Sequence, residues 1–139
     1  AIVFDGYNTP YKNEEFDLVI VSHVLEHVEY PRKLLYEAAR IGKKIFIEVP
    51  LEDNKKLTEK FILTDVGHIN FYNYKTIQLL IQTCGLQIDN KILSYPNRSS
   101  KKSIKQKVKF EIIKQLPNYF YKFATNNFTY SLSILASKE

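Results

Sequence analysis

The three histidines of this 139-residue chain lie in two short stretches. His23 and His27 flank Glu26, and His68 follows much later. Spacings of three and four place side chains on one face if the stretch is helical. An imidazole can accept a proton near neutral pH, or bind a divalent metal together with a carboxylate. The alternative is structural: His27 bonds the turn before Pro31, and His68 fixes its own loop.

The elements around the first histidines are predicted from short apolar patterns. Residues 18–21 form a continuous apolar run, as in a strand buried on both faces. Pro31 then opens a helical pattern that Gly42 closes. Residues 45–49 read as a second strand, which we expect Pro50 to stop.

The second half of the chain continues the alternation. Asn73 can cap a helix that we expect Gly85 to close, and residues 86–93 read as a third strand. Residues 128–134 alternate apolar with polar, which indicates a strand that is antiparallel or near an edge. Strands alternating with helices predict an α/β fold with a mostly parallel sheet.

Composition limits the function classes. The one cysteine excludes an intramolecular disulfide and makes a cytoplasmic location the default. No apolar stretch reaches the ~20 residues of a membrane span, and the four glycines are too scattered for a glycine-rich nucleotide loop. Residues 98–122 hold eight basic side chains and one acid, so this helical pattern either meets nucleic acid or anionic membrane, or is a solvated face.

Four stretches of the sequence together suggest a family. They are Asp5-Gly6, residues 16–19 (Phe-Asp-Leu-Val), residues 25–28 (Leu-Glu-His-Val) and residues 67–72 (Gly-His-Ile-Asn-Phe-Tyr). The pattern resembles the class I S-adenosylmethionine-dependent methyltransferases, nearest the broad group that acts on small molecules. The resemblance implies a Rossmann-like methyltransferase sheet, mostly parallel with an antiparallel last strand. It also implies S-adenosylmethionine as cofactor, at the carboxyl ends of the strands.

The resemblance also implies roles for individual residues. Asp5 and Gly6 would lie beside the adenine, and Ser22 and His23 would approach the methionyl and ribose part of the cofactor. The acceptor would be an oxygen or nitrogen of a small molecule. His27 is the favoured general base, and His68 is the second catalytic candidate.

One part of the family pattern is missing. These residues contain neither the glycine-rich loop after the first strand nor the acidic residue after the second that holds the ribose. The chain also starts at Ala1 and contains no methionine. We therefore expect residues 1–139 to be the C-terminal part of one methyltransferase domain whose N-terminal strands are missing, with a basic helical insertion at about 98–123.

Two alternatives remain open from the sequence. The chain could be a non-catalytic fragment or binding module that engages nucleic acid or membrane through its basic helix. It could also be a metal-dependent RNA methyltransferase, because a few relatives that act on RNA 3′ ends use a Glu/His metal site near this position. Leu-Glu-His-Val is common in relatives with no known metal, so the sequence assigns no metal ligand.

Overall fold

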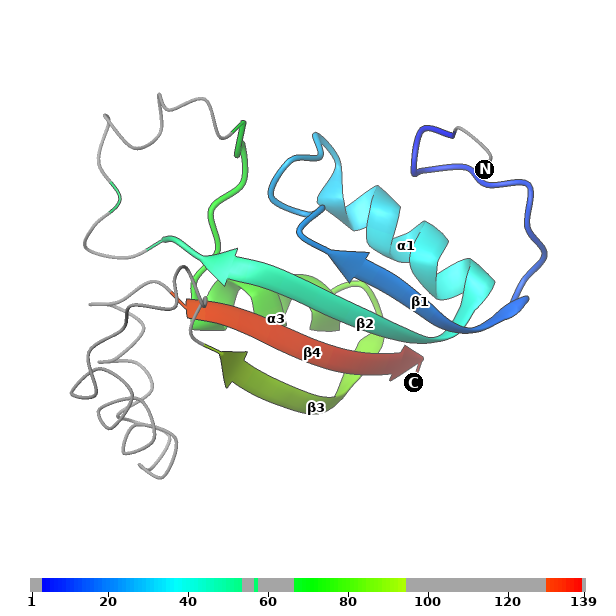
Figure 1. Ribbon diagram of the computed structural model, residues 1–139. Coiled ribbons are helices and arrows are strands. Elements are labelled where there is room, and N and C mark those ends of the chain that lie inside the picture. The colour runs from blue at the N-terminus through cyan, green and yellow to red at the C-terminus, as the bar shows by residue number, and fades with distance from the viewer. Residues whose placement is uncertain (1–3, 54–56, 58–66, 95–129, 139) are drawn as a thin grey trace, which may run out of the picture.

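The computed structural model describes residues 4–53, 57, 67–94 and 130–138, and Figure 1 shows how their elements are arranged. The strand–helix alternation expected from the sequence is confirmed, and so is the α/β class. In chain order the described elements are β1 (Phe16–Ser22), α1 (Pro31–Ile41), β2 (Gly42–Leu51), α3 (Tyr74–Gln82), β3 (Leu86–Ser94) and β4 (Tyr130–Lys138).

The described strands form one sheet in the order β1-β2-β4-β3. β1 and β2 are parallel, and β4 runs antiparallel to both of its neighbours. The alternating pattern near the C-terminus therefore correctly predicts an antiparallel strand. That strand lies inside the sheet, between β2 and β3, and not at an edge (Figure 1).

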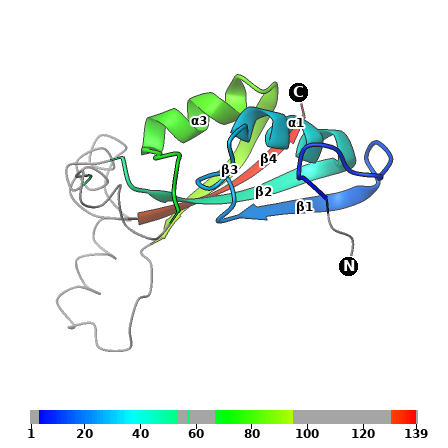
Figure 2. The same ribbon diagram turned by 90° about the horizontal axis from the view of Figure 1, so that it is seen from above.

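The two faces of the sheet are covered differently. Figure 2 shows α1 and α3 on the same side of the strands. Side chains on that face, such as Ile47, Ile134 and Ala136, are fully buried. On the other face Ile20 and Ile92 are 66% and 62% exposed.

Helix α1 begins and ends at the residues that the sequence predicts, and its apolar residues lie on one side. Pro31 occupies the first turn and Gly42 follows the last helical residue. The buried side chains Leu34, Leu35 and Ala38 lie at three- and four-residue spacing, so one stripe faces the sheet. A Cβ added at Gly42 would stand 2.7 Å from Val19 Cγ2, so the corner between α1 and β2 requires glycine.

Helix α3 is capped as the sequence predicts, but it is shorter at its C-terminus. The Asn73 side chain accepts hydrogen bonds from the backbone of Lys75 and Thr76, and Thr76 bonds back in a capping box. The helix ends at Gln82 and not at Gly85. Gly85 has a φ of +74° and makes the turn into β3, a conformation that glycine adopts without strain.

The prediction that Pro50 stops the second strand is wrong, because β2 continues through Pro50 to Leu51. Strand β1 has already ended at Ser22, opposite Glu48, whereas β2 remains paired with β4. With a ladder on one side only, a residue without an N–H is tolerated.

The basic segment at about 98–123 lies outside the described residues, as do residues 128 and 129 of the predicted last strand. Among the helices that are described, none has the length and apolar character needed to cross a membrane.

Candidate functional site

The residues after β1 and those before α3 meet at one edge of the sheet. The backbone N–H groups of Ile69 and Asn70 both donate to the carbonyl of Glu26, at 2.8 and 3.1 Å. The Asn70 amide donates to the carbonyls of Leu25 and Val28, at 3.0 and 2.7 Å. Since β1 and β2 are parallel, their carboxyl ends lie at this same edge (Figure 1), where ligands bind in open α/β sheets.

The turn after β1 is not helical, so the condition under which His23, Glu26 and His27 would share a helical face is not met. His23 has a φ of +53°, a strained conformation for a residue with a Cβ. Two bonds hold it there. Its backbone N–H donates to the Glu48 carbonyl at 2.9 Å, and its Nδ1 lies 3.1 Å from Glu26 Oε1.

The fold brings His27 and His68 together from the two loops. Their rings stand nearly at right angles with centroids 4.7 Å apart. Nδ1 of His27 donates to the carbonyl of Gly67 at 3.1 Å, and Nδ1 of His68 bonds Glu52 Oε2 at 2.6 Å. Because both acceptors take the Nδ1 proton, each ring keeps its Nε2 lone pair for a proton or a ligand.

The carboxylate of Glu26 is close to these rings, with ligand atoms of the three side chains within 4.8 Å of one another, and it is fully buried. One oxygen contacts His23, whereas Oε2 has no hydrogen-bond partner among the described residues. Nearby, the buried Tyr72 hydroxyl donates to the carbonyl of Leu25 at 3.2 Å. Burial, reinforced by the charge of Glu26, raises the pKa of Tyr72 to about 12, so the phenol stays protonated at neutral pH.

The predicted cofactor residues lie around β1. Asp5 accepts hydrogen bonds from the N–H groups of Tyr7 and Asn8 at 2.8 and 2.9 Å, which lowers the pKa of its carboxyl. Both bonds end on Oδ1, which leaves Oδ2 to accept another. Gly6, with a φ of +81°, sits against α1, and the Ser22 hydroxyl donates to Glu48 Oε2 at 2.9 Å.

The sequence analysis did not identify Glu52 as part of the site. The Glu52 and His68 side chains are only 12% and 11% exposed. No local pattern predicts this pair, because the two residues are 16 positions apart in the sequence and meet only in the folded chain.

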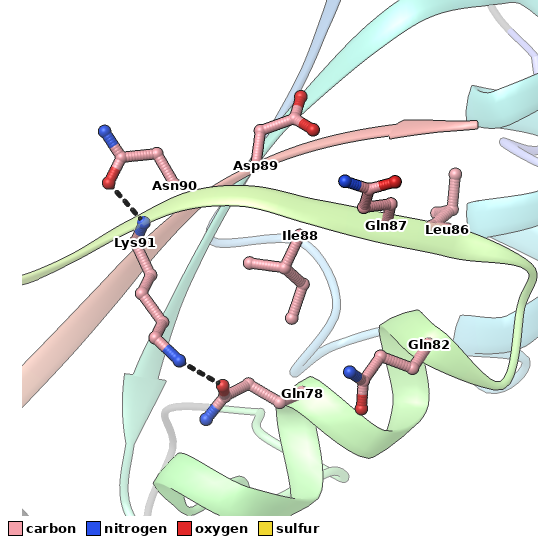
Figure 3. A pocket seen from close by; sticks show the side chains of 8 residues that line it. All are labelled: Gln78, Gln82, Leu86, Gln87, Ile88, Asp89, Asn90 and Lys91. Atoms are coloured by element: carbon pink, nitrogen blue, oxygen red, sulfur yellow. Dashed lines mark hydrogen bonds between the residues drawn. The ribbon is translucent and has the colours of Figure 1, made fainter. Parts of the chain in front are cut away.

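A second hollow lies between α3 and β3, at the opposite edge of the sheet from β1. Figure 3 shows its polar lining, in which Lys91 Nζ donates to Gln78 Oε1 at 2.7 Å. The carboxylate of Asp89 accepts a hydrogen bond from the Ser137 hydroxyl at 2.8 Å. This hollow offers no base or nucleophile that is free of a partner, so the histidine site is the stronger candidate.

The sheet belongs to the class of open α/β folds, which bind their ligands at the carboxyl ends of the strands. Residues 1–91 match the family model described as a methyltransferase domain. The chain belongs to this family, the class I S-adenosylmethionine-dependent methyltransferases, whose cofactor is S-adenosylmethionine.

The chain is also similar to individual proteins and solved structures. An uncharacterized protein of Methanocaldococcus jannaschii, MJ1123, is 30% identical over 98 residues, which are 63% of this chain and 46% of that protein. The chain thus spans less than half of that relative. A putative methyltransferase of Bacillus halodurans superposes with a TM-score of 0.62 at 15% identity, covering 97% of this chain and 75% of that one. Phosphoethanolamine N-methyltransferase 2 of Haemonchus contortus superposes with a TM-score of 0.61 at 14% identity, covering 98% of this chain and 36% of that one.

Proposed function

We propose that the protein containing this chain is a methyltransferase that moves a methyl group from S-adenosylmethionine to an oxygen or nitrogen of a small molecule. The observation that carries the proposal is the meeting of His27 and His68 at the carboxyl edge of a methyltransferase-family sheet. The solved Haemonchus relative, described in complex with phosphomonomethylethanolamine and S-adenosylhomocysteine, supports the small-molecule acceptor.

The residues around β1 suit one end of the donor. Asp5 Oδ2 can accept a hydrogen bond from the exocyclic amine of adenine, and the backbone of Gly6 can complement it. Ser22 and His23 would approach the methionyl and ribose part. The donor supplies a methyl group on a sulfonium, which transfers by in-line displacement.

The histidines would act on the acceptor. His27 is exposed, and its Nε2 lone pair can take the proton that the nucleophile loses. His68 is held by Glu52, so its ring can orient the acceptor or share the proton. Methyl transfer needs mainly alignment, so no covalent group of the protein is required.

The chain would supply only the C-terminal part of this domain. Among the described residues β1 has no strand on its outer side, and Leu18 and Ile20 of β1 are exposed on the open face of the sheet. An apolar hollow of about 230 Å³ opens along the same edge, lined in part by Val21 and Leu34. Further strands would cover these groups. In this proposal residues 98–123 are a basic insertion in the domain, and the protein is cytoplasmic.

Calorimetry with S-adenosylhomocysteine tests the donor site, on this chain and on the chain extended upstream. We expect the extended chain to bind and Asp5→Asn to weaken binding, whereas Asp89→Asn on β3 leaves it unchanged. Absence of binding by the extended chain would contradict the methyltransferase assignment.

The base is tested by kcat once an acceptor is found. We expect His27→Ala to lower kcat by about 10²–10⁴-fold, the usual contribution of a general base. The KM for S-adenosylmethionine should stay unchanged, because His27 would act on the acceptor. An unchanged kcat would exclude His27 as the base.

A further inference from the structure

We propose that Glu37 and Arg40 of α1 are positioning residues for the donor site. They hold the loop that carries Asp5, and so they fix where its carboxylate meets the adenine. The inference rests on the proposed function, in which Asp5 Oδ2 accepts a hydrogen bond from the exocyclic amine of adenine. Neither Glu37 nor Arg40 needs to touch the donor for this role.

The loop that carries Asp5 has no regular structure of its own. Residues 4–15 contain neither helix nor strand, so no backbone ladder holds them. Asp5 Oδ1 accepts from the N–H groups of Tyr7 and Asn8, but these bonds tie the turn only to itself. A longer bond of 3.3 Å joins the Tyr30 N–H to the Tyr7 hydroxyl. The position of Asp5 therefore depends on contacts further along the loop.

Glu37 supplies the shortest of these contacts. Its side chain is buried, and Oε1 accepts from both the N–H and the hydroxyl of Thr9 at 2.7 Å. Thr9 lies 28 positions from Glu37 but only four from Asp5. Hydrogen bonds to an ionised carboxylate are stronger than neutral ones, so Glu37 holds the loop firmly at this point.

Arg40 extends the same attachment along the loop. Its Nε and Nη2 donate to the two oxygens of Glu37 at 2.8 and 2.7 Å. The remaining N–H groups reach the carbonyls of Tyr11 and Thr9 at 2.8 and 3.2 Å, and Asn13 Oδ1 at 3.0 Å. Only the planar fork of an arginine can bind a carboxylate and several carbonyls at once, and a lysine cannot replace it.

The attachment acts on the path of the main chain. The N–H of Thr9 and the carbonyls of Thr9 and Tyr11 are all backbone groups, so Glu37 and Arg40 fix the course of the loop itself. Asp5, Glu37 and Arg40 also line one hollow of about 530 Å³. A shift of the loop at Thr9 would therefore displace the carboxylate of Asp5 from its place beside the adenine.

The preference for an amine on the purine ring tests this role. S-Inosylhomocysteine carries a carbonyl oxygen where S-adenosylhomocysteine carries the exocyclic amine. Calorimetry on the chain extended upstream gives the ratio of the two dissociation constants. We expect the parent to prefer S-adenosylhomocysteine by about tenfold or more, because a bond to a charged acceptor is lost with the amine. Asp5→Asn should abolish the preference and so sets the scale.

Glu37→Gln and Arg40→Lys should each lower the preference by about threefold or more, because a misaligned hydrogen bond weakens steeply. Lost stability alone cannot do this, since a smaller folded fraction weakens both ligands by the same factor. Two control variants should keep the parent ratio. Arg32→Lys alters an arginine of the same helix that bonds the Thr83 carbonyl instead, and Ile47→Val destabilises the core.

Failure of this inference is distinguishable from failure of the proposed function. If Glu37→Gln and Arg40→Lys keep the parent ratio, or if Arg32→Lys lowers it equally, the positioning role is overturned, while binding of S-adenosylhomocysteine still supports methyl transfer. A parent without any preference also overturns it, because Asp5 would not contact the amine. If the extended chain binds neither compound, the proposed function and the donor role fail together.

Discussion

The two faces of the sheet differ although the same strands build both. On the helix-covered face the row Val21, Ile47 and Ile134 is buried across three strands. The neighbouring residues in the same three strands, Ile20, Phe46 and Leu135, form an equally apolar row on the open face. On that open face Ile20 is 66% exposed.

The difference teaches that the strands carry more apolar surface than the described elements cover. Parallel strands are normally buried on both faces, because crossover helices pack on each side. Here α1 and α3 both lie on one side (Figure 2). The apolar open face is therefore built for a cover of its own, which agrees with the proposal that this chain is part of a larger domain.

The largest loss of stability should follow a substitution at the centre of the helix-covered face. Ile47 is 0% exposed, so Ile47→Ala leaves a cavity among β2, β4 and the helices. We expect the free energy of unfolding to fall by about 2–5 kcal/mol. Urea denaturation followed by circular dichroism measures it. A loss below about 1 kcal/mol would mean that the covered face is not a packed core.

A substitution at Glu37, which connects α1 to Thr9 by hydrogen bonds, should cause an intermediate loss of stability. Glu37 Oε1 accepts from both the backbone and the hydroxyl of Thr9 at 2.7 Å, and Arg40 Nε donates to Oε2 at 2.8 Å. Glu37→Gln should lower the free energy of unfolding by about 1–3 kcal/mol, because the partly buried donors of Thr9 and Arg40 lose their charged acceptor. Asp17→Asn, at an exposed ion pair with Lys43, is the control and should leave the free energy of unfolding nearly unchanged, because solvent screens an exposed pair.

The same carboxylate predicts a dependence on pH. Hydrogen bonds from Arg40 and then Thr9 lower the pKa of Glu37 from 4.5 to about 2. The unfolded chain takes up this proton first, so the stabilisation is present above pH 4.5 and is lost as the pH falls towards 2. Urea midpoints of the parent chain and Glu37→Gln should converge over this range. A constant difference would show that the charge of Glu37 is not the cause.

The smallest effect should come from the open face. Ile20→Ala removes a side chain that is mostly exposed, so the free energy of unfolding of this chain should change by less than about 0.5 kcal/mol. In the chain extended upstream the loss should be several times larger, because the cover would bury Ile20. Equal small losses in both chains would sink the idea of a cover on this face.

Local signals predicted the elements well. Pro31 and Gly42 punctuate α1, Asn73 caps α3, and the run at residues 18–21 lies within β1. The place of β4 between β2 and β3 depends on which strands pair across the whole chain, and no local pattern records that order. The extension of β2 through Pro50 depends on where its neighbour β1 ends.

The candidate site was predicted only in part. The sequence identified His27 and His68, but it could not show that they touch or that Glu26 is buried close to them. The loop at residues 67–70 donates hydrogen bonds to the Glu26 backbone. This loop comes after α1 and β2 in the sequence, so only the folded chain brings it to Glu26. The positive φ of His23 was also unpredictable, because a histidine there has no local reason to leave the helical or extended regions.

The two ends of the stretch between Asp53 and Gly67 are fastened to the rest of the fold. Asp53 donates from its N–H to the carbonyl of Tyr72 at 3.0 Å, and its carboxylate accepts from the Asn73 amide at 2.7 Å. At the other end, the Gly67 carbonyl accepts from His27. Glu52 and His68, which lie next to these two ends, are thus positioned by contacts to residues 27, 72 and 73, which are distant from them in the sequence or follow them. A substitution at Tyr72 or Asn73 would therefore be felt at the histidine site although neither residue belongs to it.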